Sequence, residues 1–292
     1  MKYLKIPIVL LLALLTTHCT DASLLFLNTI ARFGNYTSYK NIAYGENSNQ
    51  KLDIYIPQNI STIESSNIAT VVFFYGGCWG ACSHLVKEDY QFIAQTLTKN
   101  NIITIIVDYR KYPAVLFPDI IKDAASSVEW VNKNIETYKG NSNNLYLMGH
   151  SAGAHLASML TFNENYLNNT TYKNIKGFIG LAGAYDFLPF DEPYQPALFA
   201  PPADYPKSQT INYINGTEPP SLLLYGNDDK RVKRRNILSL EKGIKHKKGT
   251  VVTHFYDGID HTSIISALSI PFRASKPILN DILVFIRSTV IT

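Results

Sequence analysis

Residues 145–160 read LYLMGHSAGAHLASML, and this stretch decides the fold. An apolar run, 145–148, leads into Gly149-His150-Ser151-Ala152-Gly153, and the residues that follow are typical of a helix. A sharp turn between a strand and a helix strains the serine backbone, and small neighbours make room for it. We interpret Ser151 as a nucleophile at a helix N-terminus, where main-chain amides stabilise developing negative charge. The alternative is a glycine-rich structural turn.

Apolar runs on both sides of this turn predict a sheet. Several of them, such as residues 102–108, do not alternate between apolar and polar positions, which is typical of strands buried on both faces. Amphipathic stretches between the runs predict helices, one of which begins after Pro118 and ends before Gly140. This alternation predicts an α/β fold with a mostly parallel central sheet and helices on both faces. The expected strands are 52–56, 70–75, 102–108, 145–148, 178–181, 222–225 and 251–256, and the expected helices are 89–99, 119–136 and 278–286.

The domain organisation is simple. Residues 23–292 have the length and pattern of a single α/β domain, and no internal repeat interrupts them. Residues 186–220 interrupt the alternation of predicted strands and helices, because they contain eight prolines. We interpret this segment as a loop or a small lid over one end of the sheet.

A serine hydroxyl needs a base to take its proton, and two stretches after Ser151 supply candidates. In strand–G-x-S-x-G–helix folds the acid and then the histidine follow the serine along the chain. The run 222–225 is followed by Asp228 and Asp229, and the run 251–256 is followed by His261. We expect His261 to be the general base and one of the two aspartates to orient its ring. Asp257 and Asp260 precede His261 too closely to be its usual partner, so we expect them to shape the turn.

A third feature is a glycine-containing turn after another buried strand. The sequence VVFFYGGCWG, residues 71–80, allows the backbone to turn its amides toward a bound carbonyl oxygen. We expect the oxyanion hole to consist of the amides of Gly77, Cys78 and Ala152. Trp79 is expected either to line the substrate pocket or to pack in the core.

The N-terminus has the layout of a secretory signal peptide, residues 1–22. A short basic head precedes an uncharged apolar run, 6–15, which is too short for an ordinary membrane-spanning helix. Cys19 is either a lipid-modified first residue, which would attach the chain to a membrane, or part of the removed signal. A buried N-terminal helix is the alternative. If the chain is exported, Cys78 and Cys82 either form a disulfide or remain buried thiols.

Charge and motifs exclude several classes of function. The net charge of +4 is too small to indicate a nucleic-acid partner, and no nucleic-acid-binding motif is present. No metal-ligand spacing or phosphate-binding loop is found, so we expect no metal and no organic cofactor. The oligomeric state cannot be read from the sequence. The residues 230–235 form a basic run, which we interpret either as the solvated start of a helix or as a surface that attracts anionic substrate or membrane headgroups.

Taken together, the motifs resemble those of the small α/β-hydrolases grouped with kynurenine formamidases, prenylcysteine methylesterases and bacterial feruloyl- or acetyl-esterase-like carboxylesterases. The resemblance covers most of the chain after about residue 45 and is carried by YGGCWG (75–80), DYR (108–110), FPDIIKDA (117–124), GHSAGAHLA (149–157), GNDDKRV (226–232) and DH (260–261). In such proteins the acid lies three residues after the glycine and three before a valine, which selects Asp229. The family often has histidine where this chain has Tyr75, which we also place at the substrate pocket.

The resemblance implies a carboxylic ester hydrolase that acts on a small-molecule ester through Ser151, His261 and Asp229 and an acyl-enzyme intermediate. An amidase or arylformamidase with the same residues is the first alternative. A non-catalytic binding protein on a hydrolase fold is the second. The predicted signal peptide indicates export to a bacterial periplasm or cell envelope, where the protein is either free or anchored to the membrane as a lipoprotein.

Overall fold

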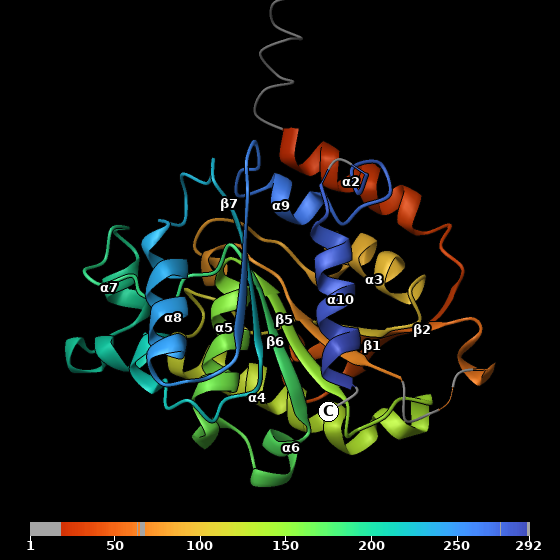
Figure 1. Cartoon of the computed structure of the whole chain (residues 1–292), viewed down its shortest axis with the longest axis horizontal. Coiled ribbons are helices and arrows are strands. Elements are labelled where there is room, and N and C mark those ends of the chain that lie inside the picture. The colour runs from red at the N-terminus through yellow and green to blue at the C-terminus, as the bar shows by residue number, and fades with distance from the viewer. Residues whose placement is uncertain (1–18, 63, 65–67, 275, 291–292) are drawn as a thin grey trace, which may run out of the picture.

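A computed structural model of the protein describes residues 19–62, 64, 68–274 and 276–290. In these residues eight strands form one sheet with the order β1-β2-β4-β3-β5-β6-β7-β8 (Figure 1). From β4 to β8 all neighbouring strands are parallel, whereas β2 pairs antiparallel with both β1 and β4. The strands are β1 (Tyr36–Ala43), β2 (Lys51–Pro57), β3 (Thr70–Phe74), β4 (Ile103–Val107), β5 (Leu145–His150), β6 (Ile175–Leu181), β7 (Ser221–Gly226) and β8 (Val251–Tyr256).

All seven expected strands are present, and β1 is the strand that the sequence did not indicate. The expected strands β3, β4, β5 and β7 are buried along their whole length, which explains their unbroken apolar runs. Strand β1 lies at the edge of the sheet and is exposed at most positions. An exposed edge strand does not need apolar residues, so its sequence carries no periodic signal.

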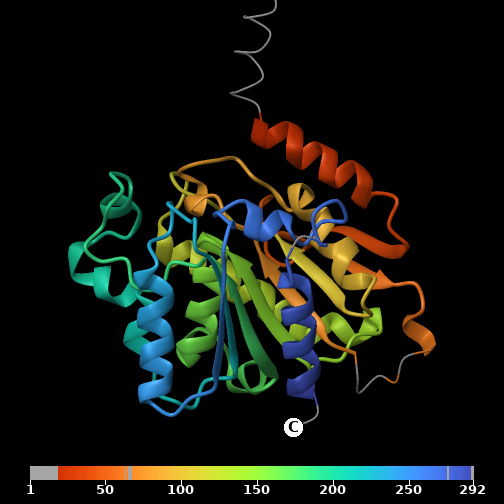
Figure 2. The same ribbon diagram turned by 45° about the horizontal axis from the view of Figure 1, so that its top comes forward.

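Helices cover both faces of the sheet, as Figures 1 and 2 show, and complete a three-layer α/β architecture. Helices α3 and α10 pack on one face, and α5 and α8 pack on the other, with α4 against α5. The expected helices appear with shifted ends, as α3, α4 and α10. The helices are α2 (Cys19–Ala31), α3 (Gln91–Thr98), α4 (Phe117–Asn134), α5 (Ala152–Phe162), α6 (Asn169–Lys173), α7 (Gln195–Leu198), α8 (Arg235–His246), α9 (Ser263–Ser266) and α10 (Ile278–Val290).

Helix α5, which follows Ser151, is the most deeply buried helix. Every one of its residues is buried, because α5 lies between the sheet and α4. A helix without a polar face of its own must be enclosed in this way. The position of Ser151 is therefore fixed by packing on all sides of the helix that it precedes.

Ion pairs to buried aspartates join segments that are far apart in the sequence. Arg110 donates two hydrogen bonds, of 2.8 and 2.7 Å, to the carboxylate of Asp123 on α4, which joins the DYR motif to the FPDIIKDA motif. Lys87 is 2% exposed, and its ammonium group lies 3.5 Å from Asp53 and 3.7 Å from Asp108. These motif residues therefore have a structural explanation that requires no contact with substrate.

The proline-rich segment 186–220 contains α7 and two 3₁₀ turns, Pro202–Ser208 and Thr210–Tyr213. The hydroxyls of Ser158 on α5 and Thr210 lie 2.7 Å apart. The segment is thus a loop with short helices that packs against α5. A function as a lid stays a prediction.

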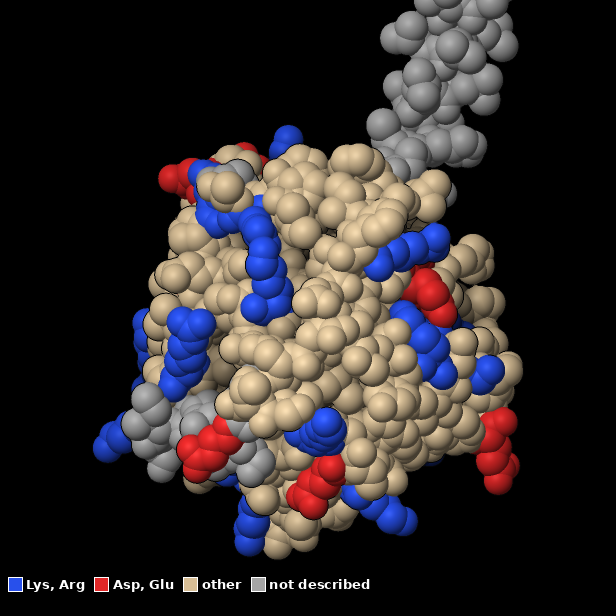
Figure 3. Space-filling model, turned by 90° about the vertical axis from the view of Figure 1, so that its right-hand side faces the viewer, with Lys and Arg blue, Asp and Glu red and all other residues tan. Residues whose placement is uncertain are grey.

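Of the predicted signal, residues 1–18 lie outside the described residues, and Cys19 is the first residue of α2. Helix α2 packs on α3 and on the 3₁₀ turn Lys87–Tyr90 before it, where the Asn28 side-chain amide donates to the Asp89 carbonyl at 2.7 Å. Within the described ranges no helix is both long and apolar enough to span a membrane. On the face shown in Figure 3, basic and acidic residues are interspersed among uncharged ones, so positive charge is not gathered there.

Candidate active site

The turn between β5 and α5 has the strained backbone that the sequence predicts. Ser151 adopts φ 56° and ψ −123°, and residues other than glycine rarely adopt a positive φ. A Cβ on Gly149 would lie 2.3 Å from the carbonyl carbon of Gly153, and a Cβ on Gly153 would lie 2.0 Å from the carbonyl oxygen of Phe74 in β3. The two glycines therefore allow α5 to approach the sheet closely enough to hold Ser151 at its edge.

Replacing Gly153 with alanine is expected to destabilise the protein by about 3 kcal/mol or more, because β3 lies inside the sheet and cannot move away from the new methyl group. Thermal unfolding of the purified variant measures the loss. Gly243→Ala is the matched control, since the added Cβ meets the end of the Ile214 side chain and alanine favours helix α8. Equal melting temperatures for Gly153→Ala and wild type would contradict the close approach.

Three distant parts of the chain meet at this edge. The Nε2 atom of His261 lies 2.9 Å from Oγ of Ser151, and Nδ1 of His261 lies 2.8 Å from Oδ2 of Asp229. The three residues directly follow, or come shortly after, β5, β7 and β8, whose carboxyl ends meet at one edge of the parallel sheet. A carboxylate, an imidazole and a hydroxyl in this order can transfer the hydroxyl proton to the ring.

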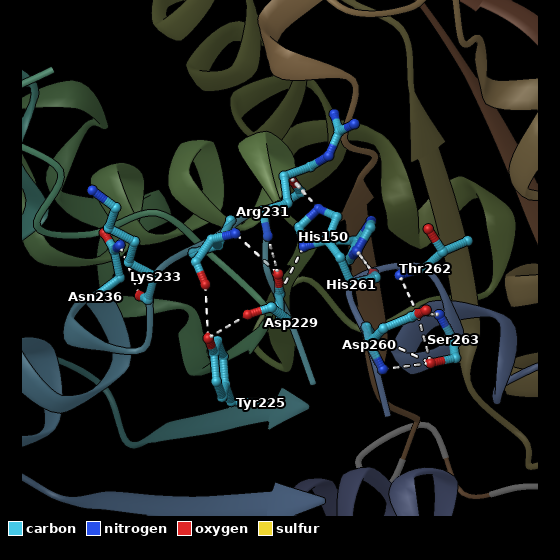
Figure 4. A network of polar contacts seen from close by, with 12 residues as sticks. His150, Tyr225, Asp229, Arg231, Lys233, Asn236, Asp260, His261, Thr262 and Ser263 are labelled. Carbon is cyan, nitrogen blue, oxygen red and sulfur yellow. Dashed lines mark hydrogen bonds and ion pairs between the residues drawn. The ribbon is translucent and has the colours of Figure 1, made fainter. Parts of the chain in front are cut away.

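Asp229, and not its neighbour Asp228, is the aspartate that reaches His261. Its side chain is fully buried, and its second oxygen accepts hydrogen bonds from the main-chain amides of Arg231 and Val232 at 2.8 and 2.9 Å (Figure 4). These bonds fix both carboxylate oxygens. Asp260 instead accepts hydrogen bonds from the amides of Thr262 and Ser263, so it shapes the turn, as the sequence suggested.

His150, which precedes the serine, has a position that the sequence did not reveal. Its ring is fully enclosed, and Nε2–H donates a 2.8 Å hydrogen bond to the main-chain carbonyl of His261. The two imidazole centroids are 4.8 Å apart. His150 therefore attaches the loop of His261 to the turn of Ser151. The second position of a G-x-S-x-G sequence carries no signal for such a contact.

The turn after β3 supplies the predicted amides. A Cβ on Gly76 would lie 3.0 Å from Cβ of Ser151, which places this turn directly beside the serine. Within the described residues no hydrogen bond occupies the amides of Gly77, Cys78 or Ala152. Cys78 and Ala152 line the same pocket as Ser151, whereas Gly77 is not among the lining residues. Amides without partners beside the serine are what an oxyanion hole requires.

Tyr75 does not line the substrate pocket, and this prediction was wrong. Its side chain is completely buried, its hydroxyl donates a 2.5 Å hydrogen bond to Asp108, and its ring stacks between Tyr90 and Tyr109. The strand alternation after Phe74 turns this side chain into the core, away from Ser151. Tyr75 is instead a core residue that supports the turn after β3 through these contacts.

Trp79 both lines the pocket and packs in the core, so both expectations describe part of its position. It is 3% exposed, and its indole N–H donates to Nδ1 of His155 at 3.2 Å. The other ring nitrogen of His155 donates to the carbonyl of Ser208 at 2.7 Å. The rings of Phe187 and Phe199 complete this aromatic cluster. His155 is therefore a packing residue that joins α5 to segment 186–220.

Both buried histidines are held neutral. Burial, and to a lesser extent the neighbouring His261, lowers the pKa of His150 to about 3, and burial lowers the pKa of His155 to about 4. An unfolded histidine has a pKa near 6.5, so at lower pH the unfolded chain binds protons that the folded chain does not. The free energy of unfolding should therefore be intact above about pH 6.5 and fall below it, by about 1.4 kcal/mol per pH unit for each histidine.

Chemical denaturation at several pH values between 6.5 and 4.5 measures this fall. His155→Gln keeps an acceptor for Trp79 but does not titrate. The slope of the unfolding free energy against pH should therefore become shallower by the contribution of one histidine. The same slope in His155→Gln and wild type would show that His155 is protonated in the folded state.

The structure pairs Cys78 and Cys82 in a disulfide, which decides between the two states that the sequence left open. The bridge spans the turn that carries Cys78 and Trp79, both with positive φ. It therefore connects the predicted oxyanion segment to the residues that follow it.

The pocket at Ser151 has a volume of about 530 Å³. Its walls come from the turn after β3, from segment 186–220 and from the loop after β7, and include Trp79, Phe187, Glu192 and Arg231. In the described part of the chain no three His, Cys, Asp or Glu side chains are grouped to hold a metal ion.

Comparison with solved structures places this fold among esterases. The chain superposes on a hyperthermophilic esterase from the archaeon Pyrobaculum calidifontis with a TM-score of 0.74 and 18% identity, over 94% of this chain and 93% of that one. It superposes on the thermophilic carboxylesterase EstE1, from a metagenomic library, with a TM-score of 0.73 and 15% identity, over 94% and 96% of the two chains. At these identities the likeness shows the fold alone.

Comparison with curated proteins finds similar enzymes. A probable isoprenylcysteine alpha-carbonyl methylesterase of Arabidopsis thaliana is 26% identical over 77% of this chain and 51% of its own length. A kynurenine formamidase of Salmo salar is 33% identical over 53% of this chain and 48% of its own length. The chain thus spans about half the length of the curated relatives that it matches.

The family model BD-FAE matches residues 52–243, which include Ser151 and Asp229 and end before His261. The match covers most of the sheet and both glycine-containing turns. With the eight-stranded fold and the esterase relatives, it shows that this chain belongs to the BD-FAE family of esterase-like α/β-hydrolases.

Proposed function

We propose that the protein is a serine-dependent carboxylic ester hydrolase. The observation that carries the proposal is the 2.9 Å contact between Nε2 of His261 and Oγ of Ser151, in a pocket beside unoccupied main-chain amides. A hydroxyl in contact with an imidazole, whose far nitrogen contacts a buried carboxylate, has the arrangement of an activated nucleophile.

The reaction follows from this geometry. Asp229 accepts the Nδ1–H bond of His261 and so leaves Nε2 free to take the Ser151 proton as the oxygen attacks the ester carbonyl. The amides of Cys78 and Ala152, together with the predicted amide of Gly77, bind the oxyanion that forms. His261 then gives its proton to the leaving alcohol. Water, deprotonated by the same ring, then attacks the acyl carbonyl and releases the acyl group as a carboxylic acid, and His261 returns the proton to Oγ of Ser151.

A formamidase is the second candidate, because a kynurenine formamidase is 33% identical over half of the chain. The same three residues can cleave an amide if His261 protonates the leaving amine. Relative rates on p-nitrophenyl esters of increasing acyl length, on phenyl acetate and on N-formylkynurenine decide between the two. We expect the esters to be turned over faster. A formamide preferred over every ester would replace the proposal with the second candidate.

We also propose that the chain is exported. The layout of residues 1–22 supports this, and so does the disulfide between Cys78 and Cys82, since disulfides persist in oxidising compartments. Mass spectrometry of the mature N-terminus, compared between wild type and Cys19→Ala, tests both export and lipidation. A full-length, unmodified N-terminus would contradict both.

A further inference from the structure

Arg231 lies between the two hollows that border the active site. Its main-chain amide donates to Oδ1 of Asp229 at 2.8 Å, so its backbone is fixed to the same carboxylate that orients His261. Its side chain lines the pocket that contains Ser151 and Trp79, and also a second hollow of about 520 Å³ that contains His261. Figure 4 shows the side chain extending away from the carboxylate of Asp229.

The guanidinium group of Arg231 has little to bind within the protein. Its only described hydrogen-bond partner is Sγ of Cys78, at 3.6 Å, and no carboxylate in the described part of the chain forms an ion pair with it. By contrast, Arg110 binds Asp123 through two nitrogens, and Lys233 binds Asp191 at 2.7 Å. Arg231 is thus an exposed residue that lines the pocket, and apart from the contact with Sγ of Cys78 the donors of its planar guanidinium have no described partner.

The other charges at the pocket do not cancel this one. Of the ionisable residues that line the Ser151 pocket, Lys233 and Asp191 neutralise each other. Lys230, Arg231 and Glu192 remain, with no described ion pair among them. Asp228 and Asp260 line only the second hollow, and Asp260 already accepts hydrogen bonds from Thr262 and Ser263. Among the residues that line this pocket, positive charges therefore exceed negative ones by one. The carboxylate of Asp229 is not among the lining residues and is bound to His261 and to two main-chain amides.

We propose that Arg231 binds a carboxylate on the substrate, so that the preferred esters carry a negative charge in their acyl or their alcohol part. A guanidinium and a carboxylate match in charge and in geometry, because two parallel N–H···O bonds can form between them. The proposal rests on the proposed ester hydrolysis and names the class of ester that this pocket selects. The guanidinium contacts Sγ of Cys78 in the pocket that Ser151 also lines, so a charged group on a substrate bound there can reach it.

Two matched pairs of esters test the proposal. In the acyl pair, mono-p-nitrophenyl adipate is compared with the p-nitrophenyl ester of adipic acid monoamide. In the alcohol pair, para-acetoxybenzoate is compared with para-acetoxybenzamide. Each pair differs by one charge at nearly constant size. At low ionic strength wild type should have the higher kcat/KM on the anionic member of at least one pair, and added salt should reduce that preference.

Substitution of Arg231 should remove the preference. Arg231→Gln is expected to lower the anionic-to-neutral ratio of kcat/KM about tenfold, mainly through KM of the anionic ester, and Arg231→Lys should lower it less. Glu192→Gln should change the ratio in the opposite direction, because it removes the carboxylate that repels the substrate. Lys242→Gln is the control: it removes one positive charge from helix α8, outside both hollows, and should leave the ratio unchanged.

Binding provides a readout that does not depend on turnover. The Ser151→Ala protein should be stabilised against thermal unfolding by para-acetoxybenzoate, and the Ser151→Ala/Arg231→Gln protein should not be. Equal losses on the charged and neutral esters in Arg231→Gln, or no preference by wild type in either pair together with no ligand-induced stabilisation, would overturn the proposal. If wild type hydrolyses the neutral esters in that case, the proposed ester hydrolysis stands without it.

Discussion

Replacing Ser151 with alanine is expected to reduce kcat on a p-nitrophenyl ester by a factor on the order of 10⁵. The hydroxyl is the atom that His261 contacts at 2.9 Å, and alanine leaves the imidazole without a proton to take and the ester without a nucleophile. The amides beside the serine remain, so a small residual rate over the uncatalysed reaction should persist. Initial rates at saturating substrate, at matched protein concentrations, measure the effect.

Ser126→Ala is the matched control for this variant. Ser126 is an exposed serine on α4 that does not line the Ser151 pocket, so its loss should leave kcat unchanged. Unfolding curves of both variants establish that the fold is intact. A Ser151→Ala protein with close to wild-type activity would show that another group performs the hydrolysis.

Replacing Asp229 with asparagine is expected to lower kcat by about 10³- to 10⁴-fold, although the change in size is small. The Asn oxygen can still accept the amides of Arg231 and Val232, which leaves the amide nitrogen facing His261. Nδ1 of His261 must then accept a hydrogen bond, and the ring proton moves to Nε2. In that tautomer the ring cannot take the proton of Ser151.

Asp228→Asn is a close control, since Asp228 is the adjacent carboxylate and does not contact His261. We expect this variant to retain most of the wild-type kcat. The comparison distinguishes orientation of the ring from general loss of negative charge near the pocket. A larger loss in Asp228→Asn than in Asp229→Asn would contradict the role assigned to the buried carboxylate.

The sequence predicted much of the fold because most of the sheet is buried on both faces. An unbroken apolar run, such as β4, can be recognised without knowledge of its neighbours. Strand β1 could not be recognised, because most of its residues are exposed at the sheet edge and do not alternate between apolar and polar. The ends of helices moved by a few residues, since the final turn depends on tertiary contacts.

The predicted site residues depended on motifs with a backbone cause. Ser151 could be found because the strain at φ 56° requires small neighbours that appear in the sequence. Tyr75 was misplaced because proximity in sequence to the oxyanion turn does not determine on which side of the strand a side chain lies. The contact of His150 could not be predicted, since its partner, the His261 carbonyl, comes from a distant part of the chain. For the basic run 230–235 the sequence left both a solvated helix start and an attraction for anionic substrate open, because the pocket that Arg231 lines is also formed by distant parts of the chain.

Reaction with a fluorophosphonate probe, followed by mass spectrometry of the digested protein, tests the central claim most directly. If Ser151 is activated by His261, the probe should add once, to the peptide that contains Ser151, and labelling should be lost in Ser151→Ala and strongly slowed in His261→Ala. A folded wild-type protein that the probe does not label, or labels at another residue, would contradict the account.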